Sequence, residues 1–203
     1  GMLYSPEKLY EKCQLVARPL KNADFIHVTD NLGTDLTLKV SGRRVNLSDG
    51  FISDEDMRAG ANGANLPTGE VFIAPLETFG EGTLFCPLTR DRYTNKIIRN
   101  LTIMFKDGRL LLDECHAGEN EEEFRKTLHN SLEVDEKKYD VIRTFNVAEL
   151  GVGVNELIDR AIGYILTDEK MGGSIHVAVG DNKSYGGTSE STLHWDFVTS
   201  NTE

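Results

Sequence analysis

The residues best suited to chemistry lie near the C-terminal end of the sequence, in two short segments typical of buried strands. Residues 173–180 place His176 among aliphatic residues, and residues 193–197 place His194 and Asp196 beside aromatic ones. Such polar side chains are costly to bury unless something pairs with them. Because side chains alternate between the two faces of a strand, His194 and Asp196 point to the same face. Two imidazoles and a carboxylate brought together by neighbouring strands suit a divalent metal ion such as Zn²⁺.

Two glutamates stand in similarly apolar surroundings. Glu70 opens the apolar strand expected at residues 70–74, and Glu149 lies among small and aliphatic residues at 147–153. A carboxylate isolated in such a place would be neutralised or expelled to solvent, whereas a metal ion or a basic partner would keep it ionised. Either acid could instead cap a backbone amide or reach solvent at the end of a strand, so neither identifies a site alone.

The five residues together make a stronger case than any one of them. Two glutamates, two histidines and one aspartate offer mixed oxygen and nitrogen ligands, which suit a pair of divalent ions bridged by a carboxylate and a water. Two such ions about 3.5–4 Å apart can activate water and polarise a carbonyl. We expect two other histidines, His27 in a strand and His129 in a polar helix, to be structural or solvated.

The elements that must position these residues follow from hydrophobic periodicity and turn signals. Ser5-Pro6-Glu7 is typical of a helix start, and Asp107-Gly108 between two apolar runs is typical of a hairpin turn. We expect helices at 6–20, 119–132 and 155–166, and strands at 25–28, 36–40, 70–74, 82–86, 97–105, 109–114, 139–147, 173–180 and 193–197. Residues 49–69 predict a long loop, which in a compact domain is more often functional than idle. These elements predict an α+β fold, a largely antiparallel mixed sheet with a few flanking helices in a single domain.

Composition narrows the class of protein. The formal net charge of −11 argues against binding to nucleic acid, whose phosphates would be repelled. No apolar run approaches the roughly 20 residues that a membrane span needs, and the N-terminal residues lack the pattern of a signal peptide. The three widely spaced cysteines favour a reducing cytoplasm over a disulfide framework. Cys115 beside His116 leaves a thiol nucleophile formally open, although a strand-end cysteine next to a surface histidine is the simpler interpretation.

A series of motifs then occurs in a fixed order. They are Gly33-Thr34-Asp35-Leu36-Thr37, Leu66-Pro67-x-Gly69-Glu70-Val71-Phe72, Ala148-Glu149-Leu150-Gly151, Asp168-Glu169-Lys170 with Gly173-x-x-His176, and His194-x-Asp196. In order and local sequence, from about Gly33 to Asp196, the chain resembles the aminopeptidase T / aminopeptidase S family of thermophilic-type metallo-aminopeptidases.

The resemblance implies a peptidase that uses two divalent ions, usually zinc or cobalt, to remove N-terminal residues from peptides. Matched residue by residue, it implies five metal ligands, with Glu149 bridging the ions at the catalytic centre: Glu70, Glu149, His176, His194 and Asp196. Tyr185, nine residues after His176, is the candidate for the tyrosine that stabilises the tetrahedral oxyanion. The resemblance also implies a homodimer.

Family members are about twice as long as this chain and have an additional N-terminal domain. We therefore expect residues 1–203 to form one metallo-aminopeptidase-like domain without that N-terminal domain, and Gly1 to be a remnant of tag removal. Two alternatives stay open. One is a catalytically impaired metal- or peptide-binding domain derived from the same family, and the other is a structural domain whose acids and histidines only hydrogen-bond to each other.

Overall fold

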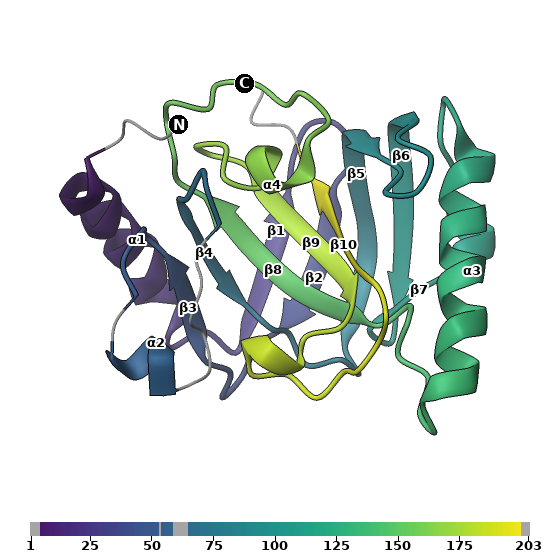
Figure 1. The fold of residues 1–203 in the computed structure, drawn as a ribbon, viewed down its shortest axis with the longest axis horizontal. Helices are drawn as coiled ribbons and strands as arrows, with labels where there is room; N and C mark the ends of the chain where they lie inside the picture. Colours follow the sequence, from purple (N-terminus) through teal and green to yellow (C-terminus); the bar gives the residue numbers. More distant parts are fainter. Residues whose placement is uncertain (1–4, 53, 59–64, 200–203) are drawn as a thin grey trace.

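In the computed structural model, which describes residues 5–52, 54–58 and 65–199, the described residues form two five-stranded antiparallel sheets (Figure 1). The first sheet has the order β1 (Phe25–Thr29), β2 (Asp35–Lys39), β5 (Gly80–Arg90), β6 (Ile97–Lys106) and β7 (Arg109–Leu110). The second has the order β10 (His194–Val198), β9 (Ile175–Gly180), β8 (Val147–Gly153), β4 (Glu70–Ile73) and β3 (Val45–Ser48). The predicted α+β class is confirmed, with two antiparallel sheets in place of one.

The main core lies between the two sheets. Leu36 and Leu84 of the first sheet share one buried cluster with Val177 and Trp195 of the second. Phe124 of α3 (Glu121–Lys138) joins the same cluster, with its ring centroid 5.6 Å from that of Trp195. Because side chains along a strand alternate between its faces, the residues next to these core positions point away from the first sheet. The outer face of the second sheet is therefore available for polar groups.

The helices cover the flanks of this sandwich. α1 (Pro6–Leu20) has the predicted bounds and packs Leu9, Cys13 and Ala17 against Val71 of β4. In Figure 1, α1 lies beside β3 and α3 lies at the opposite side, next to β6 and β7. The smaller helical elements are α2 (Asp54–Arg58), α4 (Ile165–Asp168) and the 3₁₀ turns η1 (Leu112–Glu114) and η2 (Lys183–Tyr185). Among the described residues, no helix is both long enough and apolar enough to cross a membrane.

The helix predicted at 155–166 is wrong. Only the start of α4 is helical there, and residues 155–164 are irregular apart from a bridge at Asn155 and a turn at 156–157. The carboxylate of Asp168 accepts hydrogen bonds from the backbone N–H groups of Ile162 (2.9 Å) and Gly163 (2.7 Å). Gly163 also has a φ of +75°, a left-handed conformation that interrupts a right-handed helix. Side-chain capping and a glycine turn therefore outweigh the helical spacing of the apolar residues.

The predictions at 109–114 and 139–147 are wrong over most of their length. After the two-residue strand β7, η1 interrupts the strand, and the chain then pairs with β6 again through isolated bridges, such as that between His116 and Thr102. Tyr139 caps the end of α3, the backbone N–H of Asn146 closes a turn onto the carbonyl of Arg143, and β8 begins only at Val147. The predicted loop at 49–69 contains α2, while residues 53 and 59–64 lie outside the described part.

A buried carboxylate ties α3 to the chain that enters β10. Asp135 accepts hydrogen bonds at Oδ2 from the hydroxyls of Thr144 (2.6 Å) and Ser191 (2.5 Å). At Oδ1 it accepts from the backbone N–H (2.8 Å) and the hydroxyl (2.6 Å) of Thr192. Burial raises the pKa of Asp135, but these hydrogen bonds outweigh the effect of burial and hold the pKa below the ordinary aspartate value.

We expect Asp135→Asn to lower the free energy of unfolding by about 1–3 kcal/mol at neutral pH, because acceptor capacity is lost in a buried site. A carboxyl with a depressed folded-state pKa stabilises the fold above its unfolded pKa of about 3.9, and that stability is lost as pH falls through the folded pKa. Urea unfolding of the wild type and of Asp135→Asn, at about pH 7 and at about pH 3, measures how the difference in the free energy of unfolding depends on pH. An equal difference at both pH values would contradict the assignment.

Candidate metal centre

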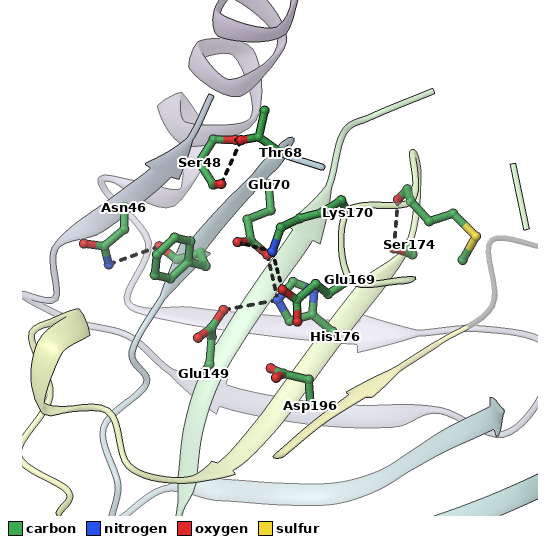
Figure 2. Close-up of polar contacts among 12 residues, drawn as sticks. Asn46, Ser48, Thr68, Glu70, Glu149, Glu169, Lys170, Ser174, His176 and Asp196 are labelled. Carbon is green, nitrogen blue, oxygen red and sulfur yellow. Dashed lines mark hydrogen bonds and ion pairs between the residues drawn. The ribbon is translucent and has the colours of Figure 1, made fainter. Parts of the chain in front are cut away.

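Four neighbouring strands place polar side chains together on the outer face of the second sheet. Figure 2 shows the side chains of Glu70, Glu149, His176 and Asp196 converging from β4, β8, β9 and β10. Each alternates with a residue of the apolar interior, as Asp196 does with Trp195. The antiparallel register sets their positions along the strands, with Gly151 of β8 opposite His176 of β9.

Five predicted ligands form two compact sets that share one residue. The first set is Glu70, Glu149 and His176, and the second is Glu149, His194 and Asp196; within each set the potential ligand atoms lie within 4.8 Å of one another. Oε1 of Glu149 lies 3.1 Å from Nε2 of His176, and its Oε2 lies 3.5 Å from Nε2 of His194. The carboxylate of Glu149 therefore spans the two sets.

The third member of each set, Glu70 or Asp196, lies at a similar distance from the histidine of that set. Oε2 of Glu70 lies 3.4 Å from Nε2 of His176, and Oδ1 of Asp196 lies 3.4 Å from Nε2 of His194. The side chain of His176 is fully buried, whereas that of His194 is 25% exposed. The second set is therefore the one that solvent reaches more easily.

The two imidazoles are oriented by different means. Nδ1 of His194 lies 2.7 Å from the backbone carbonyl of Asp181, so Nδ1–H donates there and Nε2 stays available to the carboxylates. The ring of His176 lies against the backbone of Gly151, where a Cβ atom would come within 2.0 Å of Nε2. Glycine at position 151 is therefore a steric requirement for this orientation of His176.

The carboxylates dominate the electrostatics of the site. Burial lowers the pKa of His176, but the hydrogen bond with Glu149 and the nearby negative charges outweigh it and raise the pKa to about 9. The pKa of His194 rises in the same way, to about 10, chiefly because of Asp196. Burial raises the pKa of Glu70 above its ordinary value, although the nearby charges of Lys170 and His176 act in the opposite direction. Without another cation, these carboxylates hold protons on the imidazoles.

Lys170 is a member of the site to which the sequence analysis gave no role. Its ammonium is fully buried, donates to Oε1 of Glu70 at 2.6 Å and also contacts the carboxylate of Glu169 (Figure 2). Burial together with the charge of Asp196 raises the pKa of Glu169 to about 8, and burial also raises the pKa of Glu70, so the ammonium of Lys170 serves two carboxylates whose charged forms are both disfavoured. The signal in the sequence was the Asp168-Glu169-Lys170 motif, which was noted only for its resemblance.

The donor set fits divalent cations. Oε2 of Glu70 and Oδ1 of Asp196 are buried and, within the part of the chain that the structure describes, accept no hydrogen bond. In the state that metal coordination requires, with neutral imidazoles and ionised Glu70, Glu149 and Asp196, the single ammonium of Lys170 leaves two negative charges uncompensated. Buried charges of this kind are stable when they coordinate a metal. Carboxylate oxygens and imidazole nitrogens are also the ligands that zinc takes in proteins.

Tyr185 lies beside the second set. It ends η2, and its ring packs edge-on against His194 and Phe72, with centroid separations of 5.3 and 5.2 Å. Burial and the nearby carboxylates, Glu149 first among them, raise the pKa of Tyr185. The phenol therefore keeps its proton and can donate a hydrogen bond.

The residues set aside in the sequence analysis lie elsewhere. His27 pairs with Asp35 at 2.7 Å on the exposed surface of β1 and β2. All three cysteines are free and buried, and burial raises the pKa of Cys115 to about 11, which disfavours a thiolate nucleophile.

Comparison with models of known protein families identifies a metalloprotease family. The model of the thermophilic metalloprotease (M29) family matches residues 7–203. A search of curated proteins gave no match.

Two solved structures share the fold. A 2,5-dihydroxypyridine dioxygenase from Pseudomonas putida has a TM-score of 0.67 at 20% identity, covering 97% of this chain and 55% of that one. AmpT from Thermus thermophilus has a TM-score of 0.61 at 21% identity, covering 93% and 45%. The chain thus spans about half the length of these solved structures.

Because the family model extends over nearly the whole sequence, including all five clustered acids and histidines, this chain belongs to the M29 family of thermophilic metalloproteases.

Proposed function

We propose that this chain is the metal-binding part of a dinuclear aminopeptidase. Glu70, Glu149 and His176 would hold one ion, and Glu149, His194 and Asp196 would hold the other. The observation that carries the proposal is the position of Glu149, whose two oxygens face different histidines. A carboxylate placed in this way is suited to bridge two ions, as in two-metal hydrolases.

The ions would supply an activated water and polarise the carbonyl of the scissile bond. Side chains of the protein would position the ions, compensate charge and donate a proton to the oxyanion. Glu149 keeps both halves of the centre in register, and Lys170 compensates the charge of Glu70 without occupying Oε2. Tyr185 would donate its phenolic proton to the developing oxyanion, which is the role that its raised pKa permits.

The direction of substrate approach follows from burial. Since His194 is partly exposed and His176 is not, a peptide would enter over the second set, past Tyr185. Removal of N-terminal residues, with zinc or cobalt as the metal, is proposed from the resemblance of the motifs to metallo-aminopeptidases and from membership of the M29 family. A cytoplasmic location, favoured by the free buried cysteines, and a homodimer complete the proposal.

A non-haem iron oxygenase is a weaker candidate. His176, His194 and Asp196 make up a two-histidine-one-carboxylate set of the kind those enzymes use, and one structural neighbour is named a dioxygenase. In this chain, however, the two histidines fall in separate compact sets that Glu149 joins. Two ions fit that arrangement better than one. A metal-binding domain without catalytic turnover is the other alternative.

The deciding experiment is a zinc and cobalt titration of the chelator-stripped chain by calorimetry, followed by peptide hydrolysis. We expect two ions per chain, and cleavage of a peptide with a free N-terminus but not of its N-acetylated form. Binding of two ions with no cleavage would favour the binding-domain alternative. Equal cleavage of both peptides would rule out the exopeptidase assignment.

Glu149→Ala should abolish binding of both ions together, because both sets lose a ligand. Peptide hydrolysis should be lost with the metal. His194→Ala is the matched variant, since it removes a ligand from the second set alone and should leave one ion bound. Retention of two ions by Glu149→Ala would show that Glu149 does not bridge them.

Gly151→Ala should weaken metal binding at the first set although it removes no ligand. The added Cβ would come within 2.0 Å of Nε2 of His176 and displace the ring. Gly118→Ala serves as the control, because its Cβ would approach no heavy atom closer than 3.3 Å. Calorimetry on both variants, with circular dichroism to verify folding, tests this. Unchanged affinity in Gly151→Ala would mean that His176 is not a ligand in this orientation.

Tyr185→Phe should lower kcat by about 10²- to 10³-fold, the usual effect of removing one oxyanion donor. KM and the number of bound ions should change little, since the ring contacts with Phe72 and His194 remain possible. Steady-state kinetics on the metal-loaded variant measures this. A variant with wild-type kcat would exclude Tyr185 as the donor.

A further inference from the structure

The β9–β10 connection, residues 181–193, supplies two groups to the metal centre. The backbone carbonyl of Asp181 accepts from Nδ1 of His194 at 2.7 Å, and Tyr185 packs its ring against that of His194. Neither group belongs to a regular strand. Their positions depend on whatever holds the connection in place.

A single buried carboxylate outside the metal centre joins both ends of the turn that carries Tyr185. Oε1 of Glu77 accepts from the side-chain amide of Asn182 (3.0 Å) and from the backbone N–H of Thr188 (2.6 Å). Asn182 is itself fully buried and accepts at Oδ1 from the backbone N–H of Ser189 (2.8 Å). Asn182 directly follows Asp181, so this anchor lies next to the carbonyl that orients His194.

The segment before β3 holds the middle of the same turn. Arg43 donates to Oε2 of Glu77 at 2.5 Å and to the carbonyl of Gly186 at 2.7 Å. Asn46 of β3 donates to the carbonyl of Tyr185 at 3.1 Å. Arg44 donates to the carbonyl of Ser184 at 3.3 Å. Three consecutive carbonyls around Tyr185 are thus bound by side chains more than a hundred positions earlier in the chain.

The burial of Arg43 and Glu77 indicates what their ion pair contributes. The side chains of Arg43 and Glu77 are 10% and 6% exposed, and a buried ion pair is a poor means of gaining stability because desolvation offsets the attraction. Such a pair is better explained by the geometry that it imposes. Tight packing supports this view, because a Cβ atom at Gly187 would come within 2.1 Å of the Asn182 side chain.

We propose that Glu77, together with Arg43, is a positioning residue that sets the orientation of His194 and the place of Tyr185 at the second metal set. The inference rests on the proposed dinuclear function. Glu77 acts through Asn182 and Asp181 and touches neither metal nor substrate. Loss of an outer partner that orients a metal-bound histidine commonly costs about 10- to 100-fold in metal affinity.

The test is a cobalt titration of the whole chain, followed by calorimetry and by the visible spectrum of the bound ion. In Glu77→Ala, we expect the ion that depends on His194 to bind about 10- to 100-fold more weakly and the other ion to bind as in the wild type. His194→Ala identifies which ion that is. Glu77→Gln, which can still accept from Asn182 and Thr188, should recover most of the affinity.

Two further variants separate positioning from stability. Asp91→Asn alters another fully buried carboxylate, which binds Tyr93, Thr94 and Thr127, and should lower the melting temperature without changing either affinity. Gly187→Ala leaves Glu77 intact but displaces Asn182, so it should reproduce the selective loss even if Glu77→Ala folds poorly.

If Glu77→Ala and Gly187→Ala lower only the melting temperature, as Asp91→Asn does, Glu77 is structural and the inference is wrong. That outcome leaves the dinuclear proposal intact, because the wild type would still bind two ions. A wild type that binds fewer than two ions would instead overturn the dinuclear proposal. In a chain that binds one ion, loss of that ion in His194→Ala together with weaker binding in Glu77→Ala would support the inference. Unchanged binding in Glu77→Ala would overturn it.

Discussion

The constraint on which the structure depends is the burial of several carboxylates on one face of a sheet. Glu70, Glu149 and Asp196 are each less than a tenth exposed, and together they exceed the charge that Lys170 can offset. An apolar environment penalises such charge strongly unless cations share it. The protein meets this cost with a buried lysine and two histidines, and the arrangement leaves carboxylate oxygens free for metal ions.

The rest of the fold holds the residues of this face in position. The opposite face of the same sheet packs against the first sheet through Val177 and Trp195, and this packing holds the strands that carry the predicted ligands at a fixed register. The irregular β9–β10 connection is held between Glu77 and Asp135. Rigid strands thus hold all five predicted metal ligands, while the β9–β10 connection brings Tyr185 and the carbonyl of Asp181 that orients His194. The fold alone does not decide the chemistry, since solved neighbours named as a dioxygenase and as AmpT share it.

Local patterns predicted some elements well and failed at others for identifiable reasons. Helix α1 was predicted because Ser5-Pro6 begins a helix, and strands β9 and β10 were predicted because their segments are rich in β-branched and aromatic residues and are bounded by Gly and Ser. The helix at 155–166 failed because Asp168 caps backbone amides and Gly163 adopts a positive φ, neither of which periodicity reveals. β3 was missed although apolar and polar residues alternate along Val45–Ser48, because a run of four residues is the shortest that such a pattern can mark.

The sequence by itself determined the chemical nature of the site. The residue types and the alternation of side chains along a strand, which is a local property of the backbone, were enough to place His194 with Asp196 and to predict metal ligation. Only the tertiary structure decided that Glu149 faces both histidines and that Lys170 reaches Glu70, a hundred residues away in sequence. Such contacts depend on which strands are neighbours and in what register. Packing across the whole core sets that register, so it cannot be read from any one segment.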